Sequence, residues 1–258
     1  GRPYAIGWAL PARESVLTVA AGLGALNGGA AAPTEPTTEV RIRPAAVVQA
    51  FFPGEEGGPA IAAVLRGDIS PSGRLPVSLP GSAGAQPYSY LHPTLGGLTD
   101  ITSADPTPAL PFGFGLSYTT FRHDELVADP TVAAGETFTV SVRVRNTGDR
   151  PGVDVVQLYG RDQVATIARP VAQLLAFERV ALHAGEEAVV RFAVPTQRLA
   201  FTGLRGHRIV EPGAIGLWVG GSCADQETQA TIEITGPEYA VSLDDPRTAS
   251  AEILRRTR

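Results

Sequence analysis

Two adjacent carboxylates, Glu55 and Glu56, lie in the turn GEEGG, directly before a helical pattern. Paired carboxylates are what general acid/base catalysis on a sugar requires. Adjacent side chains diverge, however, so these two cannot readily face one substrate. Carboxylates also stabilise a helix N-terminus by about 0.3–1 kcal/mol, and we favour this structural interpretation. Gly57 and Gly58 permit close backbone approach, but GEEGG lacks the Lys and Ser/Thr of a phosphate-binding loop.

A second polar group lies in the loop GDISPSGR, which contains Asp68, Ser70, Ser72 and Arg74. Such a loop could hydrogen-bond sugar hydroxyls in a hydrolase. The alternative is turn chemistry together with an arginine salt bridge, and we favour it. Ser72 is not a candidate nucleophile, because a nucleophile elbow needs the pattern G-x-S-x-G between a strand and a helix.

Aromatic side chains suit the faces of sugar rings, and Tyr88, Tyr90 and His92 form an aromatic and polar cluster on one loop. They could line the rim of a sugar subsite, but packing at an interface between domains is the interpretation we favour. Trp218 alternates with Leu217 and Val219, so it points to the opposite face of its strand. It either fills a core or lies on an interdomain face.

The remaining candidates favour no metal or redox site. We expect His123 and His183 at the surface and Cys223 to be a passive thiol, and the four His show no metal-ligand spacing. The single Cys excludes an intrachain disulfide and a Cys-rich zinc site. The spacing of a calcium loop is absent from Asp154, Asp162 and Asp244–Asp245. We therefore predict no metal site in this chain.

Charge and composition narrow the class of protein further. The 258 residues carry a net charge of -5, which gives no basic footprint for nucleic acid. An apolar run of about 18 residues, as a membrane helix needs, is absent. There is no Met, so we expect the chain to be a fragment of a longer protein. Its compartment and oligomeric state are not indicated.

The first third of the chain has the pattern of an α/β unit. Residues 45–52, AAVVQAFF, predict a buried parallel strand. A turn and then a helix follow within 53–67, with Pro59 in the first helical turn and Gly67 at the end of the helix. A short strand is expected at Val77–Leu79. Residues 11–44 are rich in Ala, Gly, Thr and Pro and indicate an atypical, flexible insertion.

The pattern changes near residue 120. Thr137–Val144 alternates cleanly between apolar and polar residues, and seven or eight short strands with regular turns follow. Such spacing predicts a β-sandwich. We therefore divide the chain into an α/β part at 1–100, a linker at 101–120, a sandwich at 121–236 and a partly ordered tail at 237–258.

Several motifs together resemble one enzyme family. They are VVQAFFPGEEGGPAIAAVLRGDISPSGRLPVSLP at 47–80, GRPY at 1–4, PFGFGLSYTTF at 111–121, and VDVVQLYGRD with LLAFERVALHAGE after it. In this order they are similar to the C-terminal region of glycoside hydrolase family 3, the β-glucosidase and β-xylosidase family. The resemblance covers about 1–10 and 45–236.

This resemblance implies an α/β remnant followed by a fibronectin type III-like sandwich, from a retaining, exo-acting β-glycosidase. Such enzymes hydrolyse O-glycosyl bonds with an Asp nucleophile and a Glu acid/base. In the family the Asp lies in an N-terminal barrel and the Glu precedes GRPY, so both lie upstream of Gly1. The implied partners are a β-linked oligosaccharide or aryl glycoside and the barrel domain. The resemblance thus implies no cofactor and no catalytic residue in this chain, and we expect the chain alone to be inactive.

Two departures from the family pattern bear on this expectation. Only a few residues separate GRPY from the following strand in the family, whereas 11–44 intervene here. That segment is either a real loop or a translated frameshift, and its composition favours the frameshift. Phe114 stands where the family usually has His. A non-catalytic sandwich binding module and a truncated gene product remain the alternative interpretations.

Overall fold

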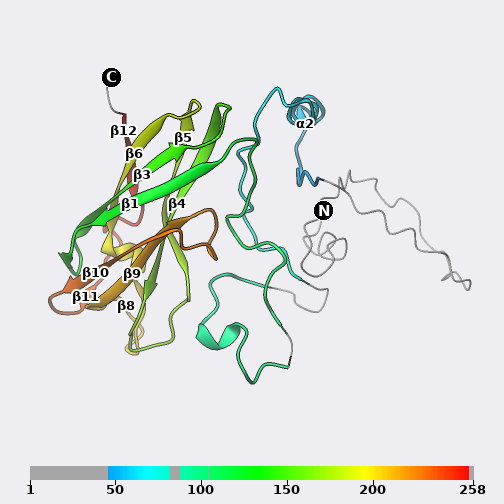
Figure 1. The fold of residues 1–258 in the computed structure, drawn as a ribbon. Coiled ribbons are helices and arrows are strands. Elements are labelled where there is room, and N and C mark those ends of the chain that lie inside the picture. The colour runs from blue at the N-terminus through cyan, green and yellow to red at the C-terminus, as the bar shows by residue number, and fades with distance from the viewer. Residues whose placement is uncertain (1–45, 82–87, 104, 256–258) are drawn as a thin grey trace, which may run out of the picture.

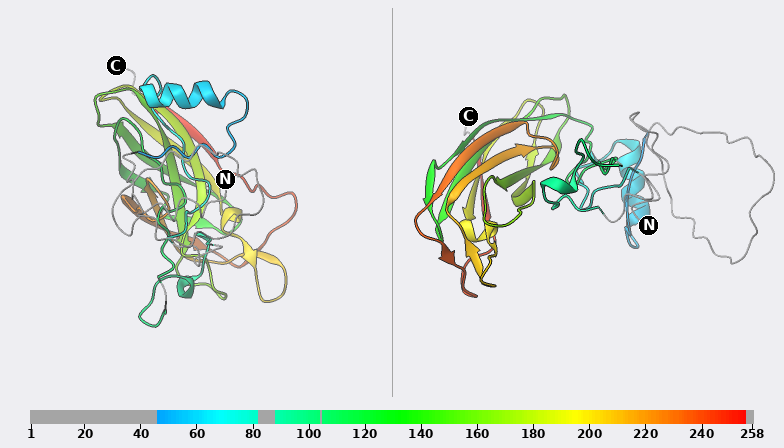
Figure 2. Two further views of the ribbon diagram at one scale, coloured as in Figure 1. Left: turned by 90° about the vertical axis from the view of Figure 1, so that its right-hand side faces the viewer. Right: turned by 90° about the horizontal axis from the view of Figure 1, so that it is seen from below.

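The computed structural model describes residues 46–81, 88–103 and 105–255. A β-sandwich forms the larger part, and α2 (Gly57–Arg66) with the extended segments around it lies on one side of the sandwich (Figures 1 and 2). A short 3-10 helix, η2 (Thr94–Gly96), lies in the connecting loop. In the part of the chain that is described, no helix is long and apolar enough to cross a membrane.

The sandwich consists of two main sheets and a small third one. The first has the order β1-β3-β6-β12, the second β2-β10-β9-β4-β5, and the third β11-β8-β7. All pairs are antiparallel except β2 with β10. The 3-10 helix η3 (Thr196–Leu199) follows β6. The strands are β1 (Phe121–Ala128), β2 (Thr131–Ala133), β3 (Thr137–Asn146), β4 (Gly152–Asp162), β5 (Gln173–Leu182), β6 (Glu187–Pro195), β7 (Phe201–Thr202), β8 (Arg208–Val210), β9 (Gly213–Gly220), β10 (Thr228–Thr235), β11 (Tyr239–Ala240) and β12 (Ser250–Arg255).

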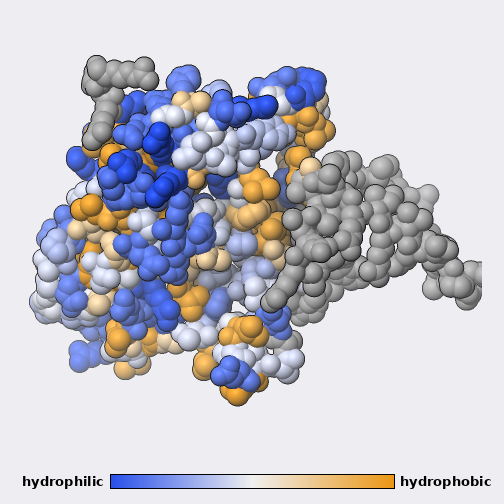
Figure 3. All heavy atoms as spheres, in the orientation of Figure 1, coloured by the Kyte–Doolittle hydropathy of each residue, from blue (hydrophilic) through white to orange (hydrophobic). Residues whose placement is uncertain are grey.

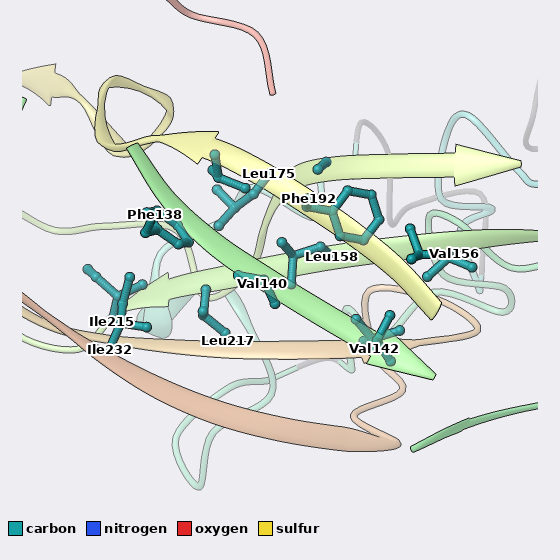
Figure 4. Packing of buried hydrophobic residues seen from close by; sticks show 14 of the residues in the cluster. Phe138, Val140, Val142, Val156, Leu158, Leu175, Phe192, Ile215, Leu217 and Ile232 are labelled. Atoms are coloured by element: carbon teal, nitrogen blue, oxygen red, sulfur yellow. The ribbon is translucent and has the colours of Figure 1, made fainter. Parts of the chain in front are cut away.

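The core lies between the two main sheets. Strand β3 alternates as its sequence predicts, and its inward side chains Phe138, Val140, Val142 and Val144 are fully buried. Figure 4 shows Phe138, Val140 and Val142 facing apolar residues from β4, β9 and β10 of the second sheet. Burial of about 25 cal/mol per Å² of apolar surface makes this core the main stabilising element. The predicted fold class, an α/β remnant followed by a β-sandwich, is confirmed.

The sandwich does not end at residue 236, as the predicted boundary has it. Strand β12, in the predicted tail, pairs with β6 from Ser250 to Arg255 and completes the first sheet. Ala251 and Ile253 pack against the core from this strand. The sequence signal is weak because only a few apolar residues alternate there. The prediction of a partly ordered tail is therefore wrong for 250–255.

The α/β part differs from its prediction in its strands. The helix is confirmed, and it ends at Gly67, which has the left-handed φ of 80° and caps two carbonyls of the last turn. Residues 46–50, within the predicted strand 45–52, are not in a strand, and Leu79 forms only an isolated bridge with Leu110. A parallel strand needs hydrogen-bonded neighbours on its edges, and the described residues supply none. Segment 11–44 lies outside the described residues.

Candidate functional site

The most elaborate polar and aromatic arrangement lies where the segment 68–121 contacts the sandwich. The motif at 111–121 is central to it. Leu75 donates its backbone N–H to Phe114 at 2.8 Å, and Gly113 donates to Leu75 at 2.8 Å. Tyr118 donates its hydroxyl to the carbonyl of Val64 at 2.7 Å, which fixes α2 to the motif. The motif thus joins α2, the segment 73–79 and the first sandwich strand.

A buried charge network fixes the same segment to the sandwich. Arg74 donates from Nη2 to Oδ1 of Asp154 on β4 at 2.9 Å, and the Asp154 side chain is only 3% exposed. His123 on β1 contacts Oδ2 of the same carboxylate through Nε2 at 2.7 Å. Its Nδ1 lies 2.6 Å from Oε2 of Glu227, which precedes β10. One cluster therefore links both main sheets and the segment before the sandwich.

The geometry of His123 defines its protonation state. Both ring nitrogens face carboxylate oxygens, so a neutral imidazole would direct one lone pair at an anion. Burial lowers the pKa of His123, but the hydrogen bonds and charges of Asp154 and Glu227 outweigh it and raise the pKa to about 9. Burial raises the pKa values of the two carboxyls, but the His123 contacts leave both below their ordinary values. The cluster is thus an imidazolium and an arginine compensating two carboxylates.

An aromatic cluster adjoins this network on the outer face of the second sheet. Tyr90 stacks on Phe112 with ring centroids 4.2 Å apart and meets Tyr159 edge-on at 6.4 Å. Tyr159 stacks on Trp218 at 5.7 Å. Burial raises the pKa of the Tyr159 hydroxyl, which donates to Gln157 at 2.7 Å. Aromatic pairs in these geometries contribute about 0.5–1.5 kcal/mol beyond their burial.

Gly113 is a position where the backbone of the motif lies close against the sandwich. Its φ is 84°, and an added Cβ would overlap the side-chain oxygen of Gln157 and lie 2.5 Å from the Tyr159 hydroxyl. Gln157 also donates to the carbonyl of Gly113 at 3.1 Å. Only glycine satisfies both the backbone conformation and the contact.

The predicted candidates with acidic and hydroxyl groups have structural surroundings. Glu55 and Glu56 are exposed, and Glu56 is the N-cap of α2 without a side-chain cap hydrogen bond. Asp68 forms an exposed ion pair with Arg66. Ser70 contacts Ser117 at 2.9 Å. In the same loop, Ser72 accepts a hydrogen bond from Arg179, and Arg74 forms the salt bridge expected of this loop, with Asp154.

The structure places the predicted aromatic residues in different surroundings. Tyr90 packs in the interface, as the favoured interpretation has it, whereas Tyr88 contacts His92 with ring centroids 5.6 Å apart. Trp218 points away from the sandwich core and belongs to the interface cluster, which decides between the two alternatives left open for it. Burial raises the pKa of the Cys223 thiol to about 11, consistent with a passive role.

The prediction for His123 is wrong. It is 5% exposed rather than at the surface, since the third residue of the strand FRHDELVA points inward. The charged residues around it gave no sequence signal for this orientation. His183 is exposed, as predicted. Asp162 lies 3.7 Å from Arg169, and Asp245 accepts a hydrogen bond from Tyr239, next to Asp244. The described ranges contain no cluster of three or more His, Cys, Asp or Glu that could hold a metal ion.

Several residues of this interface have no role in the sequence-based predictions. Glu227, Gln157, Tyr159 and Phe112 gain their roles only through contacts between distant segments. Phe112 lies within the recognised motif at 111–121, so the motif is the one signal that could have located it. Glu227 lies 104 positions after its partner His123, and no local pattern marks it.

Comparison with known proteins gives two family matches. The model of the glycosyl hydrolase family 3 C-terminal domain matches residues 27–118. The model of the fibronectin type III-like domain matches residues 154–223. The first match begins inside the segment 11–44 and ends within the motif at 111–121. The two matches lie on either side of the interface described above.

Relatives and solved structures agree with these matches. A periplasmic β-glucosidase of Salmonella typhimurium is 39% identical over 186 residues, which cover 68% of this chain and 24% of the relative. A β-xylosidase of Formosa agariphila is 37% identical, covering 73% and 27%. The crystal structure of a Listeria innocua β-glucosidase with glucose is similar at a TM-score of 0.68 and 33% identity, covering 73% and 28%. The chain thus spans about a quarter of these proteins.

Proposed function

The chain belongs to the C-terminal region of glycoside hydrolase family 3, and we propose that it is the scaffold part of a retaining, exo-acting β-glycosidase. The parent protein would remove β-linked glucose or xylose from the ends of short saccharides. The names of the relatives, β-glucosidase and β-xylosidase, support this substrate class. The catalytic Asp and Glu, about 5–5.5 Å apart in retaining enzymes, would belong to other parts of the parent.

The acidic residues of the interface support a scaffold role rather than a catalytic one. Asp154 is buried against Arg74 and His123, and Glu227 is held by His123. A nucleophile or acid/base must reach substrate, and these carboxylates are engaged in compensating buried cations. Glu55 and Glu56 are exposed neighbours in a turn. No pair of these carboxylates therefore suits a reaction centre.

One observation carries the proposal: the segment before the sandwich exposes apolar side chains that a complete domain would bury. Phe52 is 90% exposed, Leu95 81% and Ile101 91%. Figure 3 shows hydrophobic surface around α2 and on the loop with η2. Exposed apolar area of this kind marks an interaction surface. We propose that the remainder of the α/β domain and the barrel of the parent protein cover this surface.

A chimera tests this proposal directly. The C-terminal quarter of the Salmonella β-glucosidase would be replaced by this chain, joined at the start of the matched region. We expect the chimera to hydrolyse an aryl β-glucoside, because the replaced part supplies packing surfaces rather than reacting groups. A matched chimera with Arg74→Ala should lose activity together with stability. A chimera that is folded by circular dichroism and monodisperse, yet inactive, would contradict the proposal.

A further inference from the structure

The outer face of the second sheet has a covered half and an open half. Across β10, β9 and β4, one row of neighbours is Gln229, Trp218 and Tyr159, and the next is Thr231, Gly216 and Arg161. The aromatic cluster covers the Tyr159 end of the first row. Gly216 has no side chain, so the second row is hollowed at its centre. A groove of about 500 Å³ lies there, within the range of about 300–1,000 Å³ of small-molecule sites.

The side chains that line this groove can both donate and accept hydrogen bonds. Its polar lining consists of three amides, one hydroxyl and one guanidinium: Gln163, Gln226, Gln229, Thr231 and Arg161. All five residues are exposed. Within 46–81, 88–103 and 105–255 none of these side chains has a hydrogen bond or ion pair. No carboxylate lines the groove. This contrasts with the covered half, where Gln157 and Tyr159 are bonded to each other.

Trp218 lines the groove together with Leu217 and Ala230. It is only 4% exposed and stacks on Tyr159, so it forms part of a rigid floor rather than an open stacking surface. Its indole N–H is buried without a hydrogen-bond partner among the described residues. A buried donor left unpaired costs about 1–3 kcal/mol. The groove therefore adjoins a buried aromatic side chain with an unsatisfied donor.

We propose that this groove on the outer face of β4, β9 and β10 binds a neutral, β-linked oligosaccharide. Sugar hydroxyls both donate and accept, as the amides and Thr231 do, and Arg161 adds donors without an opposing acid. A single guanidinium is too little positive charge for a polyphosphate. The choice of β-linked glucose or xylose units rests on the proposed function. The identification of the groove as a binding site does not depend on that function.

Binding to the full chain tests the inference with named sugars. Cellotetraose and xylotetraose would be titrated by calorimetry and by chemical-shift perturbation, with maltotetraose as the α-linked comparison. We expect the β-linked sugars to bind and Arg161→Ala to weaken binding about ten-fold, as loss of a charged hydrogen bond does. Gly216→Val should abolish binding by filling the groove. Its Cβ would lie 3.3 Å from the flexible amide end of Gln163, so the strand should tolerate it.

The control is Arg191→Ala on the opposite sheet, another exposed arginine whose replacement should leave binding unchanged. Absence of binding by the folded chain would overturn the inference, and so would binding that survives both groove variants. Equal binding of maltotetraose would overturn the choice of β-linked sugar. An inactive chimera in the preceding experiment affects none of these readouts, so the two proposals fail separately.

Discussion

The charge state of His123 should make the stability of the fold depend on pH in a defined window. Folding raises the pKa of His123 from 6.5 to about 9. The imidazolium contribution is therefore complete below pH 6.5 and is lost as the pH rises to 9. Each pKa unit corresponds to 1.36 kcal/mol, so the free energy of unfolding should fall by about 3 kcal/mol across this window.

Denaturant unfolding followed by far-UV circular dichroism measures this dependence at constant ionic strength between pH 6 and 9.5. The matched control is His183→Gln, since His183 is exposed and its replacement should leave the profile unchanged. His123→Gln should flatten the profile between pH 6.5 and 9. It should also destabilise the fold by about 3–5 kcal/mol, because the buried Asp154 and the partly exposed Glu227 lose their shared imidazolium.

The imidazole resonances of His123 give a second readout that does not need a stable variant. They should report a charged ring at pH 7.5, while His183 serves as the internal comparison. A stability profile of the native chain that is flat from pH 6.5 to 9, or a His123 ring that is neutral at pH 7.5, would refute the reasoning.

Three further predictions concern the interface and the last strand. Gly113→Ala should cost more than 2 kcal/mol of unfolding free energy, whereas Gly206→Ala, with a similar φ but open space around it, should cost about 1 kcal/mol. Arg74→Ala should destabilise the fold by about 3–5 kcal/mol and expose the segment 68–81 to limited proteolysis, whereas Arg66→Ala, at an exposed ion pair, should cost below about 1 kcal/mol. Ile253→Asp should lower the thermal unfolding midpoint by several degrees, since β12 packs this side chain on the core; an unchanged midpoint would place β12 outside the cooperative fold.

The sandwich was predictable because its strands carry their own signal. Alternation over Thr137–Val144 marks one buried face, and Gly185 turns the chain with a φ of 73° between β5 and β6. The helix 57–66 was also predictable from local sequence, because its apolar spacing and the capping Gly67 lie in one short segment. Strand β12 was not predicted, because its sequence lacks a long alternating run. Its stability comes from pairing with β6.

The interface was predictable only in part. The motif at 111–121 indicated a junction, but which side chains it contacts depends on residues far away in the sequence. His123 lies in a charged strand and was assigned to the surface, although it is buried in contact with Asp154 on β4 and Glu227 just before β10. Trp218 could be placed on one face of its strand but not against a partner. Local periodicity gives the face of a residue, whereas tertiary contacts give its neighbours.

The most direct test of the scaffold assignment is hydrolysis by the 258-residue chain alone. 4-Nitrophenyl β-glucoside and β-xyloside would be incubated with the folded chain and with a heat-denatured sample of equal concentration. We predict no release of nitrophenol above the denatured control, because none of the carboxylates described above forms a reaction centre. Reproducible turnover by the purified folded chain, at a rate proportional to its concentration, would contradict it.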